Sequence, residues 1–206
     1  MLYEAEPGEL LYADCRPGFR GRRRHKVGPW LMTEVAEEGA AVVHGFIEDT
    51  EVEVLFELQN LTEVGTRALS SATLTVGLCG LASSAEVVDE PLDASWQSYD
   101  EMSLSVVEKE NDWRLTGKII ALEALRNPQS GSDLFWFLVE IGELQLEIVV
   151  NQRMLDGSRI AIGSYIKADV WLQGHIVPEP KQSNGYEGID WTVRPSDHWF
   201  ALRRPN

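Results

Sequence analysis

Alternating apolar and polar residues mark the clearest element of the chain. From Glu51 to Leu58 the apolar side chains Val52, Val54, Phe56 and Leu58 share one face, and glutamates occupy most of the other. Period-two alternation predicts a strand that buries one face. A β-rich run, 40–47, precedes it, and the residues between them are typical of a tight turn. The pattern therefore predicts a β-hairpin over 40–58.

The same arrangement recurs over 134–150, where Gly142-Glu143 separates two β-rich runs. Leu144, Leu146, Ile148 and Val150 alternate with Glu143, Gln145 and Glu147 in the order and parity of the first hairpin. We interpret this as an internal repeat. A two-residue turn at 142–143 would set Trp136 across from Val149.

Further strands are expected around the two hairpins. A long strand is predicted at 113–125, although its tail could be helical, and shorter strands at 72–77 and 165–174. The fold class expected is mostly β with few short helices. Two alternatives remain, two tandem small barrels or one composite β domain.

A resemblance narrows the barrel type. A long strand with Gly117, a hairpin, a connector and a last strand opened by Gly163 resembles the oligonucleotide/oligosaccharide-binding (OB) barrel. In particular, the run from Gly117-Lys118-Ile119 through Val149-Val150-Asn151 to Val170-Trp171-Leu172-Gln173-Gly174 is similar to small bacterial proteins of unassigned function that carry OB-like domains. The resemblance covers mainly 112–178 and implies a five-stranded Greek-key fold. It supplies no functional residue.

Composition shifts suggest five segments. They are an N-terminal arm with a basic stretch (1–29), a first OB-like half (30–88), an acidic linker (89–111), a second OB-like domain (112–178) and a C-terminal aromatic segment (179–206). The aromatic segment, which includes Trp191 and Trp199, is expected to dock on the body or on a second subunit.

Net charge argues against nucleic acid as the main partner. The chain carries a formal charge of −15, and one basic stretch holds six positive charges with no acid between them, so the rest carries −21. We interpret that stretch as docking on the acidic body. The alternative is single-stranded nucleic-acid binding, with phosphate contacts from Arg20, Arg22, Arg23, Arg24 and Lys26.

The N-terminus starts acidic, and no apolar run reaches the roughly 20 residues that span a bilayer. We therefore expect a cytoplasmic protein without a membrane partner, in which Cys15 and Cys79 are reduced thiols.

Motifs for catalysis are not recognisable in the sequence. Phosphate loops, dinucleotide fingerprints, hydrolase elbows and zinc-protease helices are missing, so no catalytic residue, metal or cofactor is assigned. We interpret His44 and His175 as structural, and Ser196-Asp197-His198 as a turn. The acidic face of the first hairpin is interpreted as solvated, with carboxylate-based chemistry or a cation site as the alternative.

Aromatic residues on polar strand faces are the stronger anomaly. Tyr165 and Trp171 share the polar face of their strand with Lys167, and Trp136 lies on the outer face of the second hairpin. These four residues are the candidate binding site for a protein partner or a small ligand. The function expected is a non-enzymatic binding or interaction module, with a second copy in a homo-oligomer as one candidate cover for this face. The alternatives are nucleic-acid binding and an enzyme of unknown reaction.

Overall fold

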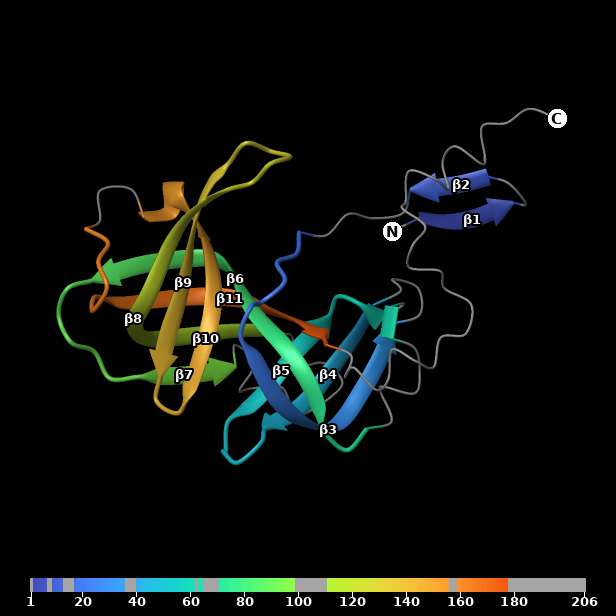
Figure 1. Ribbon diagram of the computed structural model, residues 1–206, viewed down its shortest axis with the longest axis horizontal. Coiled ribbons are helices and arrows are strands. Elements are labelled where there is room, and N and C mark those ends of the chain that lie inside the picture. The colour runs from blue at the N-terminus through green and yellow to red at the C-terminus, as the bar shows by residue number, and fades with distance from the viewer. Residues whose placement is uncertain are drawn as a thin grey trace.

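The computed structural model describes most of the chain between residues 17 and 177 (Figure 1). The described residues are 2–6, 9–12, 17–35, 40–61, 63–64, 71–98, 111–155 and 159–177, with only the backbone described at 2–12, 34, 35 and 40. The predictions for Cys15, Arg16 and the segment 179–206 lie outside the described residues.

The described chain is mostly β, as predicted. In chain order the strands are β1 (Leu2–Glu6), β2 (Glu9–Tyr12), β3 (Arg24–Val35), β4 (Ala40–Ile47), β5 (Glu53–Leu58), β6 (Leu74–Val88), β7 (Ser95–Ser98), β8 (Asp112–Arg126), β9 (Asp133–Ile141), β10 (Leu144–Asn151) and β11 (Tyr165–Ile176). A short 3-10 helix, η2 (Gln152–Leu155), follows β10. None of the described residues forms a helix of the length and apolarity that a membrane crossing requires.

Nine strands join into one sheet that closes on itself. The order is β11-β5-β4-β3-β6-β10-β9-β8-β7, and β11 also pairs with β6 and β8. These pairings make two five-stranded circuits, β3-β4-β5-β11-β6 and β8-β9-β10-β6-β11 (Figure 1). Each circuit contains one parallel pair, β5 with β11 and β10 with β6. Both circuits therefore depend on the same two strands, as in a composite β domain.

The strands β6 and β11 are long enough to take part in both circuits. One edge of β6 pairs with β3 through Leu74–Gly77 and then with β10 through Cys79–Leu81, while its other edge follows β11 from Val76 to Val88. β6 changes from β3 to β10 between Gly77 and Cys79, and β11 changes from β8 to β5 between Trp171 and Gln173. As a result, apolar side chains of both circuits belong to one continuous core.

Both predicted hairpins are confirmed. β4 pairs with β5, and Asp49 at φ 63° completes their turn. β9 and β10 are joined by the two-residue turn at Gly142, and Trp136 lies opposite Val149 as predicted. The tail of the predicted long strand is also extended, because β8 continues to Arg126 and pairs with β9.

One predicted segment boundary coincides with the end of a strand, and another lies inside a strand. Position 88 is the end of β6, whereas position 29 lies inside β3, so Arg24 and Lys26 belong to a strand. The expected linker contains β7, which pairs with β8. The segments themselves stay a prediction.

Candidate functional site

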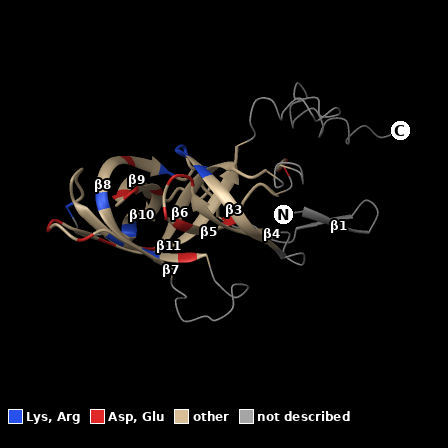
Figure 2. Cartoon of the chain, turned by 90° about the horizontal axis from the view of Figure 1, so that it is seen from below, with Lys and Arg blue, Asp and Glu red and all other residues tan. Residues whose placement is uncertain are grey.

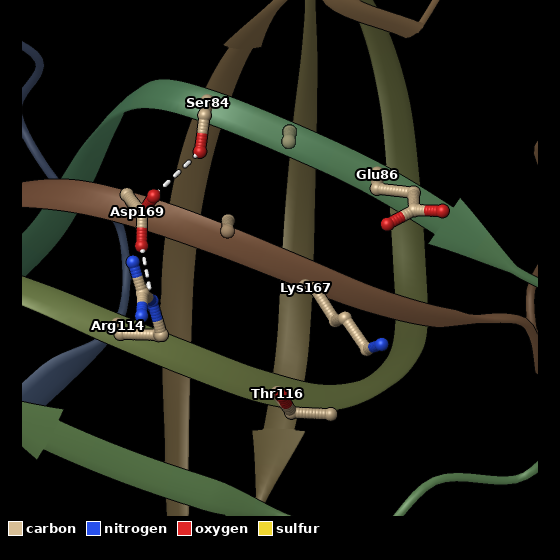
Figure 3. A pocket seen from close by; sticks show the side chains of 8 residues that line it. Ser84, Glu86, Arg114, Thr116, Lys167 and Asp169 are labelled. Atoms are coloured by element: carbon tan, nitrogen blue, oxygen red, sulfur yellow. Dashed lines mark hydrogen bonds and ion pairs between the residues drawn. The ribbon is translucent and has the colours of Figure 1, made fainter.

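A groove opens on the outer side of three neighbouring strands, β6, β11 and β8. Its volume is about 390 Å³, and its lining comprises Ser84, Ala85, Glu86, Arg114, Thr116, Lys167, Ala168 and Asp169 (Figure 3). Six of these side chains are polar or charged. The groove is therefore one place on the described part of the chain where a small polar molecule can lie against the sheet.

Strand register brings these side chains together. Lys167 is aligned with Glu86 on β6 and Thr116 on β8, and Asp169 is aligned with Ser84 and Arg114. Alternate residues of a strand point to the same side, and Ile166, Ala168 and Val170 are buried in the core. Lys167 and Asp169 consequently face outward between two strands.

A hydrogen-bonded chain fixes one end of the groove. The hydroxyl of Ser84 donates to Oδ2 of Asp169 at 2.8 Å, and Nε of Arg114 donates to Oδ1 at 2.8 Å (Figure 3). Ser83 is the extra residue where the pairing of β6 with β11 shifts between Asp169 and Val170, and its hydroxyl donates to the Asp169 carbonyl oxygen at 3.2 Å. The carboxylate of Asp169 is thus held by both neighbouring strands.

The other end of the groove carries separated charges. The Lys167 ammonium is exposed and makes no ion pair with another described residue, and it points toward the Thr116 side of the groove (Figure 3). Glu86 lies on the opposite side of β11, on β6. A cationic group on β11 and an anionic group on β6 are therefore aligned on the outer face, beside Ala85 and Ala168, which also line the groove.

Three of the four predicted binding residues lie on one row. Tyr165, Lys167 and Trp171 occupy alternate outward positions of β11, with Asp169 between the last two. Tyr165 and Trp171 are half-buried and flank the groove along the strand. Alternation within one strand predicted this grouping, whereas the contributions from Arg114, Ser84 and Glu86 come from other strands and had no local signal.

Trp136 lies on β9, three strands away from the β11 row. Trp136 on β9 is aligned with Val149 on β10, which is aligned with Leu81 on β6, and Leu81 is aligned with Trp171 on β11. Three strand spacings, about 14 Å in total, therefore lie between the two tryptophans. The indole nitrogen of Trp136 donates to Glu147 at 2.7 Å, and the guanidinium of Arg22 lies 5.1 Å from its ring centroid. Trp136 thus packs against the basic segment, whereas Tyr165, Lys167 and Trp171 line β11.

That basic segment, residues 17–26, docks on the acidic body. Ion pairs join Arg20 to Glu63 at 3.1 Å, Arg22 to Glu123 at 2.5 Å and Lys26 to Glu48 at 3.5 Å. Arg24 contacts Nε2 of His175 at 3.2 Å. Basic and acidic residues are interspersed over the strands (Figure 2). These contacts agree with the docking interpretation and leave less positive charge for phosphates.

Glu147 holds the segment at its centre. Although it lies on the polar face of β10, it is fully buried, and it accepts hydrogen bonds from the Arg23 amide and the Trp136 indole. Cys79, aligned with Glu147 on β6, is also buried, and burial raises the pKa of its thiol. The alternation predicted correctly on which face of the strand Glu147 lies, but it did not predict that the basic segment covers this residue. The local sequence feature that points to burial of Glu147 is the apolar run that follows it, Ile148 to Val150.

The three described histidines are buried. His44 and His175 are buried, and His44 packs edge-on against Trp30 at 5.3 Å between ring centroids. Burial, with Arg24 and Arg20 nearby, lowers the pKa of His175. The described residues contain no group of three or more His, Cys, Asp or Glu side chains placed to hold a metal ion. The triplet Ser196-Asp197-His198 lies outside the described residues.

Similarity to other proteins adds no family to this picture. Comparisons of the chain with family models, with curated proteins and with solved structures find no match.

Proposed function

We propose that this protein is a non-enzymatic binding module that holds a small zwitterionic ligand in the groove over β6, β11 and β8. The observation that carries the proposal is Lys167, whose ammonium stands in the groove without an ion pair to another described residue. Beside it, Asp169 is already bound by Arg114 and Ser84. Lys167 therefore supplies the charge that a ligand would neutralise.

The charge pattern favours a zwitterion over a simple anion. Glu86 on β6 is directly aligned with Lys167 on β11, and directly paired residues on neighbouring strands have their Cβ atoms about 5 Å apart. An anion bound at Lys167 alone would be repelled by Glu86. A molecule with a carboxylate and an ammonium close together, such as a free amino acid or the end of a short peptide, satisfies both groups.

We propose further that both strand circuits are OB-type barrels. In each, three strands form a meander and its third strand pairs in parallel with a shared strand. In chain order each meander is followed by a strand that pairs with its first strand, β6 in one circuit and β11 in the other. This strand order supports the five-stranded Greek-key barrel. The reciprocal use of β6 and β11 also supports the internal repeat.

Ligand screening with a charge-matched control tests the binding proposal. The probes are free amino acids and glycyl dipeptides, together with their N-acetylated and C-amidated forms, and thermal stabilisation followed by calorimetry is the readout. Lys167→Met should abolish binding, whereas Arg153→Met, which removes an exposed positive charge on η2 outside the groove, should not. The blocked forms should bind more weakly than the free zwitterions.

Either of two outcomes would reject the proposal. One is that none of the probes stabilises the protein, and the other is that Lys167→Met binds as well as the unaltered chain. Binding of blocked and free forms with equal affinity would reject the zwitterionic ligand class while leaving the groove as the site.

A further inference from the structure

A second surface, outside the groove, carries the most exposed aromatic side chains of the described residues. Trp30 on β3 is 50% exposed and Phe46 on β4 is 45% exposed, although both belong to paired strands. Large apolar side chains in regular strands are usually covered on at least one side. Neither residue follows from the polar-face pattern that led to Trp136, Tyr165 and Trp171.

Local backbone features hold the two rings outward. Phe46 is aligned with Gly28, which has no side chain to cover it. The pairing of β3 with β4 shifts between Pro29 and Leu31, so Trp30 is the extra residue of an irregularity, a feature that often redirects a side chain. The Trp30 ring packs edge-on against the buried His44 at an interplanar angle of 70°. This contact gives the indole a defined orientation.

Carboxylates border these rings. Glu53 on β5 is aligned with Phe46, and Glu48 follows Phe46 by two positions and pairs with Lys26 at 3.5 Å. The turn between β4 and β5 adds the exposed Asp49 and Glu51. We call Trp30, Phe46, Glu48 and Glu53 the aromatic-acidic face. It lies on the first circuit and shares no residue with the groove.

We propose that the aromatic-acidic face binds basic side chains from an extended segment of a partner protein. Cations are attracted to the faces of aromatic rings, and tryptophan is the best of these rings. The neighbouring carboxylates add charge complementarity, and the net charge of −15 attracts basic partners while repelling phosphate backbones. Two aromatic rings beside the carboxylates of Glu48 and Glu53 therefore favour lysine or arginine over an apolar ligand.

Spacing suggests the form of the bound segment. Trp30 lies two residues along β3 from Gly28, which is opposite Phe46, so the Cα atoms of the two residues are about 8 Å apart, from about 6.6 Å along and about 4.8 Å across the strands. Alternate side chains of an extended peptide are spaced by about 7 Å. Basic residues at positions i and i+2 of a partner therefore match the two rings.

Fluorescence anisotropy with a labelled Gly-Arg-Gly-Arg-Gly-Arg peptide tests this inference at about 0.15 M salt, where long-range attraction is screened. Trp30→Ala combined with Phe46→Ala should weaken binding at least about tenfold. Both substitutions preserve the net charge, so general attraction of the peptide to an acidic protein cannot explain a loss. Ile162→Ala and Met154→Ala, which remove exposed apolar side chains elsewhere, should leave the affinity unchanged.

A conservative pair guards against unfolding as the cause. Trp30→Phe with Phe46→Tyr keeps both rings and should retain most of the binding. The inference is overturned if the alanine pair binds the peptide as tightly as the unaltered chain, or if the control variants lose binding to the same extent. It is also overturned if the unaltered chain prefers a twelve-residue oligothymidylate and the alanine pair loses that binding, because the face would then be a nucleic-acid site.

Discussion

Trp96 and Trp113 stack face to face, with ring centroids 4.3 Å apart and an interplanar angle of 7°. Each indole also donates a hydrogen bond to the backbone of β5, Trp96 to the Glu53 carbonyl and Trp113 to the Leu55 carbonyl, both at 2.9 Å. Leu55 is buried there although it shares a strand face with glutamates. The stacked pair therefore joins β7 and β8 to a strand of the other circuit.

Replacing Trp113 by phenylalanine should reduce stability by about 1–3 kcal/mol. The ring is largely retained, but the buried Leu55 carbonyl loses its donor, and an unsatisfied buried group carries most of that cost. Urea unfolding measures the change. Trp30→Phe, at an exposed position, should stay within about 0.5 kcal/mol. Equal losses in the two variants would show that the hydrogen bond to β5 contributes little.

Gly174→Ala should destabilise the first circuit by about 1–3 kcal/mol, the usual cost of an overpacked core. A Cβ at this position would lie 2.6 Å from Cε2 of Phe56 and 3.0 Å from Cγ1 of Val76, on the inner side of β11. Gly28→Ala is the matched control, because its nearest neighbours are 4.0 Å away. Thermal unfolding of both variants measures the difference in stability. Equal stability of Gly174→Ala and Gly28→Ala would contradict the close packing around Gly174.

His25 should make stability fall as the pH decreases from 6.5 to about 4. Burial, with a smaller contribution from Arg23, lowers the pKa of His25 from 6.5 to about 4. The unfolded chain then binds a proton more readily than the folded chain in this window, so the contribution present above pH 6.5 is lost on acidification. A shift of this size corresponds to about 3 kcal/mol.

Urea unfolding at several pH values measures this effect in the unaltered chain and in His25→Gln, which does not titrate. The charges facing His25 in the structure are Arg23 and Glu147, and both are retained in the variant. The difference in stability between the two proteins should shrink toward acidic pH. A constant difference would mean that His25 titrates alike in the folded and unfolded chains.

Glu147→Ala should release the basic segment. The carboxylate accepts hydrogen bonds from the Arg23 amide and the Trp136 indole, and bonds to a charged acceptor contribute about 1.5–3 kcal/mol each. Trypsin should therefore cut among Arg20 to Arg24 about ten times faster or more. Glu143→Ala, in the exposed turn after β9, should cleave at the original rate. Unchanged cleavage in Glu147→Ala would show that the ion pairs alone hold the segment.

Alternation along the chain was enough for the local elements. It predicted the hairpins β4–β5 and β9–β10, the inward set Leu144, Leu146, Ile148 and Val150, and the register of Trp136 with Val149. It also placed Tyr165, Lys167 and Trp171 on one row. These properties depend on residues two positions apart and on a tight turn, so neighbouring residues are sufficient to specify them.

Tertiary structure alone decided which faces are covered. Glu147 and Glu143 have the same parity, yet a segment more than a hundred residues earlier buries the first and the second stays exposed. Trp136 is capped by Arg22, while Trp30 and Phe46 remain uncovered. The sharing of β6 and β11 between two circuits is likewise a matter of long-range pairing. Strand periodicity defines two faces of a strand, but what lies against each face depends on chain segments that are distant in sequence.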